Sequence, residues 1–244
     1  MAPAGDCSSP LLQEPGAAAE AGDRHAIKCV LVGDGAVGKT ALVVSYSTNG
    51  FPSRYVPTAY DTFTVVVRVD GRPYSVQLCD TAGLDALDPV RALCYPDADV
   101  FLVVFSVVAP ATLRSVERRW APEVRRCCPD APLVLVGTQA DRRRDARLLA
   151  ELSARGQAPV SSARAAEAVR AVGAAVYVET SALTQRDLKE AFDQAIVCAL
   201  RRRGLLPLNS HRNAEGRQQH QQRKRTLDDV KAPKHFWDIL NKKK

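Results

Sequence analysis

The stretch Gly33-Asp34-Gly35-Ala36-Val37-Gly38-Lys39-Thr40 decides the fold of this 244-residue chain. It follows the apolar run Ile27–Val32 and leads into the helical pattern Ala41–Tyr46, so it joins a strand to a helix. It fits the pattern GxxxxGK[ST] at every fixed position. Glycines let the backbone N–H groups point inward at phosphate oxygens, and the positive end of the following helix adds to the field. The stretch therefore predicts a site for the phosphates of a nucleotide.

Two polar residues of this stretch carry chemistry that its glycines cannot supply. The ammonium group of Lys39 is expected to neutralise charge on the β- and γ-phosphates, and the hydroxyl of Thr40 is suited to bind Mg²⁺. A chance match to this pattern would not be expected to lie between a strand and a helix, as this stretch does. We therefore expect a nucleoside triphosphate bound together with magnesium.

Short, continuous apolar runs recur along the chain and alternate with helical patterns. Because these runs are apolar on both faces, they are typical of parallel strands buried between two layers of helices. Four runs have this character: Ile27–Val32, Asp99–Phe105, Leu133–Val136 and Val176–Val178. An Asp-Gly turn predicts that two further segments form a hairpin and add an antiparallel edge: Thr64–Val69 and Tyr74–Cys79.

Helical spacing appears between these strands. Apolar residues recur every three or four positions in the segments 113–124, 166–172 and 188–196. Gly173 is expected to end the second helix, and Thr184 is expected to open the third. Six predicted strands that alternate with helices in this way are typical of one α/β domain over about residues 27–203.

Polar residues follow two of the predicted strands, at the edge where open α/β sheets bind ligands. Thr138, Gln139 and Asp141 come after one strand, and Ser181 and Ala182 come after the other. A carboxylate there can accept both N–H groups on one edge of guanine, whereas adenine has no such pair. Asp141 therefore favours GTP or GDP over ATP. Taken alone, a loop aspartate is more often a turn residue or a helix cap.

The composition is that of a soluble globular protein, with 46% hydrophobic and 25% charged residues. No apolar run approaches the roughly 20 residues of a membrane-spanning helix, and residues 1–26 lack the pattern of a secretory signal. We expect a cytoplasmic protein whose residues 1–26 form a flexible extension. The seven cysteines are irregularly spaced, which favours neither a disulfide framework nor a zinc site.

Positive charge is concentrated at the end of the chain. Residues 201–244 hold 13 Lys or Arg against 4 Asp or Glu, so residues 204–244 are expected to form a basic, disordered tail. Such a tail favours an anionic membrane surface, and we expect peripheral contact with the plasma membrane or endomembranes. The alternative is a solvated end without a partner. No nucleic-acid partner is expected, because no recognition fold accompanies the tail.

Several longer stretches match one known family. They are Cys29-Val30-Leu31-Val32, Tyr55-Val56-Pro57-Thr58, Asp80-Thr81-Ala82-Gly83 and Ser181-Ala182-Leu183-Thr184-Gln185. With them, about residues 27–200 resemble a Ras-superfamily small GTPase of the Rho family, and about residues 142–159 resemble its helical insert. Within that family the chain is most similar to the atypical RhoU/RhoV branch, through Asn49-Gly50, Leu78-Cys79-Asp80 and Leu188-Lys189-Glu190.

The resemblance implies the fold and the ligand site. It implies the three-layer α/β fold of Ras-like P-loop NTPases, with a mostly parallel six-stranded sheet, one antiparallel edge strand and the Rho-type insert. GTP or GDP and Mg²⁺ are the implied ligands, with Thr40, Thr58 and Asp80 (through a water) at the metal. The implied nucleotide contacts are Gly33, Asp34, Gly35, Ala36, Val37, Gly38, Lys39, Thr40, Ala41, Phe51, Tyr55, Thr58, Asp80, Ala82, Gly83, Thr138, Gln139, Asp141, Ser181, Ala182 and Leu183.

The resemblance also implies a molecular switch. Phe51 is expected to pack against guanine, Thr58 to sense the γ-phosphate and Gly83 to offer its N–H to that phosphate. Loss of the phosphate would then release both switch loops. Through the first switch, residues 56–61, the chain is expected to engage effectors of cytoskeletal and adhesion signalling such as CRIB-containing kinases.

The chain departs from the family at the residues that govern hydrolysis. The implied catalytic positions are Lys39, Thr58 and the position after Gly83, where the family normally has a Gln that orients water and this chain has Leu84. A leucine has no donor or acceptor, so hydrolysis is expected to be slow and poorly stimulated. The residues that follow, Asp85-Ala86-Leu87, also differ from the family pattern, so exchange factors and GTPase activators are expected to fit poorly.

The end of the chain differs as well. Rho proteins generally carry a lipidated cysteine near the C-terminus, and no cysteine follows Cys198 here, so lipidation by that route is not expected. Two alternatives to a signalling switch stay open. One is a pseudo-GTPase scaffold that holds nucleotide as a structural ligand and recruits partners through its surface and tail. The other is a P-loop ATPase or nucleotide kinase.

Overall fold

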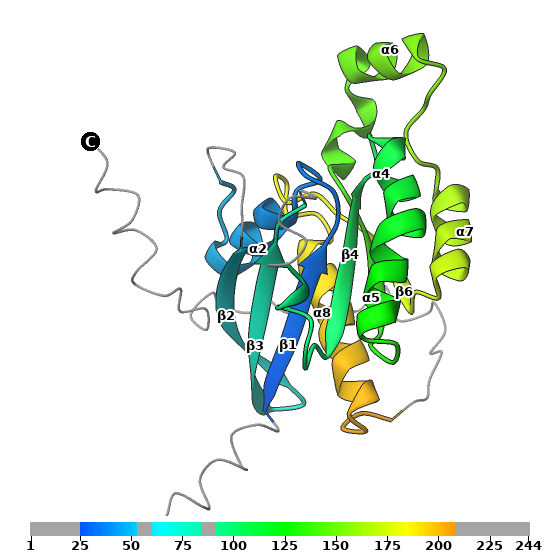
Figure 1. Ribbon diagram of the computed structural model, residues 1–244. Coiled ribbons are helices and arrows are strands. Elements are labelled where there is room, and N and C mark those ends of the chain that lie inside the picture. The colour runs from blue at the N-terminus through cyan, green and yellow to red at the C-terminus, as the bar shows by residue number, and fades with distance from the viewer. Residues whose placement is uncertain (1–24, 53–59, 84–90, 208–244) are drawn as a thin grey trace, which may run out of the picture.

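A computed structural model describes residues 25–52, 60–83 and 91–207 of the chain (Figure 1). The predictions made for Tyr55, Thr58 and Leu84 lie outside these residues, as do those for residues 1–24 and 208–244. No helix of the described part is long and apolar enough to cross a membrane.

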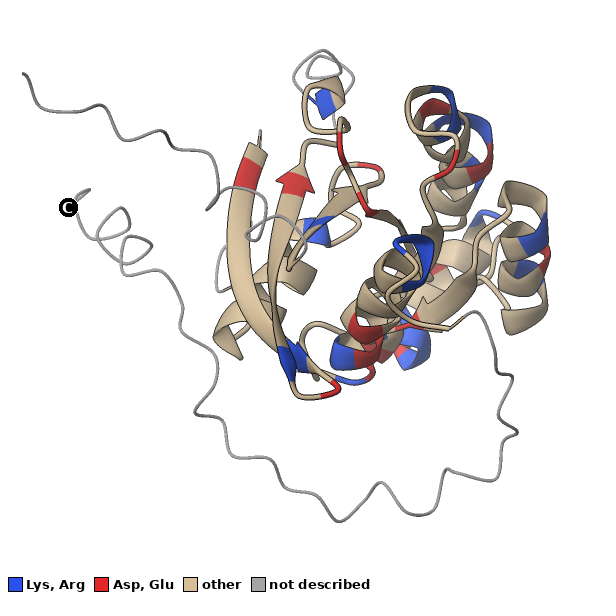
Figure 2. Cartoon of the chain, turned by 90° about the horizontal axis from the view of Figure 1, so that it is seen from below, with Lys and Arg blue, Asp and Glu red and all other residues tan. Residues whose placement is uncertain are grey.

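A six-stranded sheet in the order β2-β3-β1-β4-β5-β6 forms the centre of the molecule. All neighbouring strands run parallel except β2 and β3, which pair antiparallel at one edge, so the predicted fold class is confirmed. The strands are β1 (Ala26–Val32), β2 (Tyr60–Val69), β3 (Arg72–Thr81), β4 (Val100–Ser106), β5 (Leu133–Thr138) and β6 (Val176–Glu179). Figure 2 shows that charged residues lie mainly on the helices and at the strand ends.

The predicted hairpin is present and longer than the apolar pattern suggested. Asp70 and Gly71 have φ angles of 49° and 81°, which suits the tight turn between paired strands. Strand β2 already begins at Tyr60, because residues 60–62 pair with the end of β3 although they are exposed or only partly buried. Asp80 therefore lies within a strand rather than in a loop.

Helices cover both faces of the sheet and create two separate cores. On one face lie α2 (Lys39–Thr48) and α8 (Leu188–Arg202), and on the other α4 (Pro110–Ser115), α5 (Ala121–Cys127) and α7 (Ser162–Val172). Strand β4 is buried along its whole length because it serves both cores. In the region of the predicted insert, a 3₁₀ turn (Ala140–Arg144) precedes α6 (Ala146–Ala154), which projects from the end of the molecule in Figure 1.

Two helix predictions meet different outcomes. Gly173 ends α7 in the left-handed conformation, as predicted. The expectation that Thr184 opens the last helix is wrong, because α8 begins at Leu188. The backbone N–H of Thr184 instead donates to Ser181 Oγ at 3.1 Å, and Gln185 and Asp187 both have positive φ angles, which a helix cannot contain.

The backbone at Gly33 leaves no space for a side chain. A Cβ atom there would lie 2.2 Å from the carbonyl oxygen of Val104, and the φ angle is +151°. We predict that Gly33→Ala lowers the free energy of unfolding by at least about 2 kcal/mol, because clash and backbone strain add. Urea unfolding measures the change. Gly71→Ala is the control, since its φ of +81° is strained but nothing lies within 4 Å; an equal loss in both variants would contradict the clash.

Candidate functional site

The phosphate loop, residues 33–40, lies at the carboxyl end of β1 and passes directly into α2. Gly38 precedes the helix with a φ of +99°, which frees the helix N-terminus to face the loop. The ammonium of Lys39 donates to the carbonyl oxygens of Gly33 at 2.7 Å and Asp34 at 2.9 Å. The loop is thus folded around its own lysine, and the predicted contact of Lys39 with phosphates stays a prediction.

Lys39 is a buried cation. Its side chain is 6% exposed, and burial lowers its pKa to about 8, against the opposing effect of the carboxylates of Asp80 and Asp34. A buried ammonium is strongly stabilised when an anion binds next to it. The loop is therefore suited to a highly charged ligand such as a polyphosphate.

A hydroxyl and a carboxylate meet beside the loop. The hydroxyl of Thr40, at the start of α2, donates to Asp80 Oδ2 on β3 at 2.6 Å, and Asp80 is fully buried. Hydroxyl and carboxylate oxygens are hard ligands of the kind that Mg²⁺ takes in phosphate sites. This pair fits the metal site that the resemblance implies, in which Thr40 binds Mg²⁺ and Asp80 reaches it through a water.

Gly83 packs directly onto the phosphate loop. A Cβ atom there would lie 2.4 Å from both the carbonyl carbon of Asp34 and the nitrogen of Gly35, so only glycine fits. Ala82, just before it, is 2% exposed. The residue that leads into the second switch, residues 84–91, is therefore in contact with the loop that is expected to hold the phosphates.

Two residues at the end of β5 and directly after it bind the phosphate loop from the other side. The hydroxyl of Thr138 donates to the carbonyl of Val37 at 2.5 Å and to that of Phe105 at 2.9 Å. The side-chain amide of Gln139 donates to Ala36 at 3.2 Å, and Gln139 itself has a φ of 61°. These residues hold the loop in shape in addition to any contact they make with a ligand.

Asp141, the residue predicted to select guanine, is held by the loop that follows β6. Asp141 Oδ1 accepts the hydroxyl of Ser181 at 2.5 Å. The backbone N–H of Ala140 donates to Thr180 at 3.2 Å, which joins the ends of β5 and β6. One oxygen of Asp141 is thus oriented by the protein, an arrangement suited to a rigid base contact.

The rim of this region is apolar and exposed. Phe51 is 49% exposed and Leu183 is 56% exposed, so neither belongs to a core. Gln185 donates to the carbonyl of Asn49 at 3.0 Å, which ties the loop after β6 to the end of α2. An exposed ring at this rim is consistent with packing against a flat base.

Comparisons with known proteins give the family. Residues 28–201 match the model of the Ras family. The Rho-related GTP-binding protein RhoV of Bos taurus is 50% identical over 202 residues, which cover 82% of this chain and 86% of the relative. RhoV of Homo sapiens is 52% identical over 181 residues, which cover 74% and 77%. The chain is a Rho-family small GTPase. Within the family it is RhoU/RhoV-like, as the sequence indicated.

Arg91, the last residue of the second switch, has a structural role that no sequence pattern predicted. Arg91 of the GTPase is 1% exposed and forms two hydrogen bonds to Glu123, at 3.0 and 3.1 Å. It also donates to the carbonyl of Ala82 at 3.3 Å, and the hydroxyl of Tyr95 donates to Glu123 at 2.7 Å. The residues on either side of segment 84–90 are therefore held together and fastened to α5. No local pattern marks this pairing, because its partner lies 32 residues away.

The structure gathers most of the predicted site at one end of the sheet. The phosphate loop, Asp80, Gly83, Thr138, Gln139, Asp141 and Ser181 are linked by the contacts above. Ala41, Ala182 and Leu183 lie in the same segments, at the start of α2 and after β6. Tyr55, Thr58 and Leu84 lie outside the described residues, so their roles stay predictions. Within the described ranges, no group of three or more His, Cys, Asp or Glu is placed to hold a metal by itself.

We predict that nucleotide affinity falls as the pH rises above about 8, the pKa of Lys39. Below that pH the ammonium is already protonated before binding. Above it, the phosphates raise the pKa, so binding takes up a proton and the dissociation constant rises by up to about tenfold per pH unit. Fluorescent GDP titrations from pH 7 to 9 measure this. A Lys189→Gln variant, which loses an exposed lysine on α8, should keep the same profile; a flat profile in the unaltered chain would contradict the assignment.

Proposed function

We propose that this Rho-family GTPase is a guanine-nucleotide switch that binds GTP or GDP with Mg²⁺ and hydrolyses GTP slowly. The observation that carries the proposal is the phosphate loop itself, folded around the buried ammonium of Lys39 beside the paired Thr40 and Asp80. The family supports it, since the relatives are named as GTP-binding proteins. Identification of the nucleotide that co-purifies with the protein is the direct test.

In this proposal the chain's residues bind and orient the phosphates. The loop amides and Lys39 hold the triphosphate, and Thr40 and Asp80 hold the metal, which supplies charge stabilisation when bound. Asp141 selects guanine. Thr58 and Gly83 sense the γ-phosphate, so its loss releases the segments on both sides of the site.

The same proposal extends to partners. Effectors such as CRIB-containing kinases would read the first switch, which begins in residues outside the described part and continues into β2 at Tyr60 and Asp61. Tyr60 is 45% exposed and β2 is the edge strand, so this surface is available to a partner. Membrane contact through the basic tail stays a prediction of the sequence.

We predict that Asp141→Ala lowers GTP affinity by roughly 100-fold, because two hydrogen bonds from guanine to a carboxylate are lost. ATP affinity should change by less than about threefold, since adenine makes no such pair of contacts. Competition of GTP and ATP against a fluorescent nucleotide measures both. Glu151→Ala, which removes an exposed carboxylate on α6, is the control and should leave the preference intact. Equal affinity for GTP and ATP in the unaltered chain would rule out the role of Asp141.

We predict that Leu84→Gln speeds single-turnover γ-phosphate release by at least about tenfold, because the glutamine side chain can orient the attacking water. Phosphate release from preloaded protein is the measurement, and Leu84→Ile, which also lacks a donor and an acceptor, is the matched control. If neither the unaltered chain nor Leu84→Gln turns over while both retain GTP, the pseudo-GTPase scaffold is the better description.

A further inference from the structure

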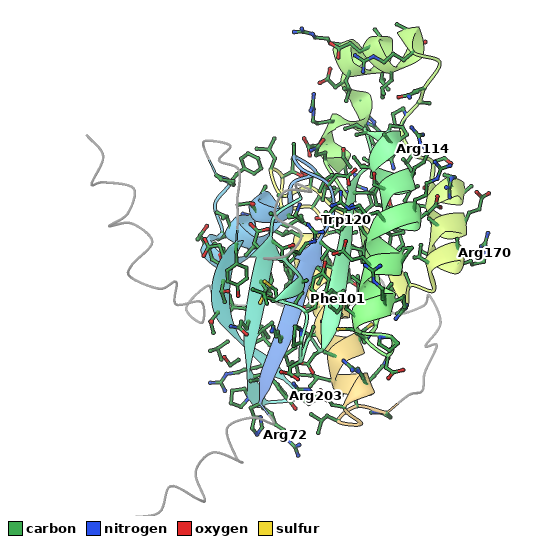
Figure 3. The ribbon with its side chains drawn as sticks, viewed as in Figure 1. Arg72, Phe101, Arg114, Trp120, Arg170 and Arg203 are labelled. Carbon is green, nitrogen blue, oxygen red and sulfur yellow. The ribbon has the colours of Figure 1, made fainter. Side chains whose placement is uncertain are left out.

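Trp120 is joined to the phosphate loop by a hydrogen bond between residues 86 positions apart. Its indole N–H donates to Asp34 Oδ1 at 2.7 Å. Trp120 is fully buried. Asp34 occupies a position of the pattern GxxxxGK[ST] at which any residue type is allowed. In Figure 3, Trp120 lies between the sheet and the helix that carries it, toward the end of the sheet where the loop lies. The carboxylate of Asp34 is therefore turned toward this helix.

The helix that carries Trp120 is not a regular α-helix at this point. A π-helical turn, Val116–Trp120, stands between α4 and α5, with Val116 and Trp120 buried. Such single wide turns inside α-helices shift the direction of the residues they carry, and they occur often at functional sites. The predicted regular helix over residues 113–124 is thus interrupted where Trp120 reaches the loop.

Positive charge surrounds the indole ring. The guanidinium carbon of Arg119 lies 4.3 Å from the ring centroid, and that of Arg91 lies 4.6 Å from it. Cations over an aromatic face stabilise it in one position. The donor that holds Asp34 is therefore fixed by packing and by charge.

A carboxylate in a phosphate loop is unfavourable unless something holds it away from the ligand. Phosphates and a carboxylate repel each other, most strongly where water is excluded. The main chain of Asp34 contacts both Lys39, through its carbonyl, and Gly83, the expected γ-phosphate neighbour. An Asp34 side chain released from Trp120 could turn toward the same phosphate.

We propose that Trp120 is a positioning residue for the nucleotide, because it holds the Asp34 carboxylate away from the terminal phosphate. This rests on the proposed function, in which the loop binds guanine nucleotide. The residue contributes no contact to the ligand itself. Its effect should be larger for a triphosphate than for a diphosphate, since the repelling charge lies near Gly83.

The test is a double-mutant cycle on nucleotide dissociation from the full chain. Trp120→Phe keeps an aromatic ring and removes the N–H, and it should raise the dissociation rate of a non-hydrolysable GTP analogue by roughly three- to tenfold, with a smaller effect on GDP. Asp34→Ala removes the carboxylate that Trp120 restrains, and its own dissociation rate is the reference for the double variant. Added to Asp34→Ala, Trp120→Phe should change the rate by less than about twofold, a loss of effect that a purely structural role of Trp120 would not give.

Val124→Ala is the matched control, because Val124 is fully buried in the same core one turn further along. It should lower the unfolding temperature without changing the dissociation rates. The inference is overturned if Trp120→Phe leaves the GTP-analogue rate unchanged, or if it raises the rate of the Asp34→Ala variant by the same factor as that of the unaltered chain. If the unaltered chain binds no guanine nucleotide at all, the proposed function fails instead, so the two failures are distinguishable.

Discussion

One buried positive charge organises the ligand-binding end of this GTPase. Lys39 lies inside the protein, and an ammonium is stable there only with oxygen partners close by. The carbonyls of Gly33 and Asp34 supply two of them, which forces the loop to curl around the lysine. Burial lowers the pKa of Lys39 against the opposing effect of the Asp80 and Asp34 carboxylates. In the proposed function a polyphosphate would complete the environment of Lys39, so the buried ammonium accounts both for the shape of the loop and for the ligand that it would bind.

The sheet brings the remaining groups to that charge. Because its parallel strands all end at one edge, segments distant in sequence meet there: Asp80 from β3, Thr138 from β5 and the Ser181 loop after β6. The hydrogen bonds from Thr138 to Val37 and from Ser181 to Asp141 are made within the protein and need no ligand. Because these groups are already ordered in the folded domain, ligand binding does not have to supply the free energy of ordering them.

A second set of contacts connects the site to the helices on the opposite face from α2. Arg91 lies over the ring of Trp120 and binds Glu123, while Trp120 binds Asp34. The phosphate loop, the flanks of segment 84–90 and the α4–α5 helix are thus parts of one connected network. A change in one of them has a physical route to the others, through packed and charged groups.

The sequence by itself determined the class of fold, the phosphate loop and the hairpin at the edge of the sheet, because these depend on local patterns: apolar runs, an Asp-Gly turn and fixed glycine spacing. It also placed Asp80, Asp141 and Ser181 at strand ends, where the geometry of parallel sheets brings them together. Strand and helix limits were less predictable, since the pairing of residues 60–62 and the Ser181 turn before α8 depend on neighbours. Only the tertiary structure decided the partners of Trp120 and Arg91. Those partners lie 86 and 32 residues away, and a helical apolar pattern records that a side chain is buried without recording which polar atom it meets.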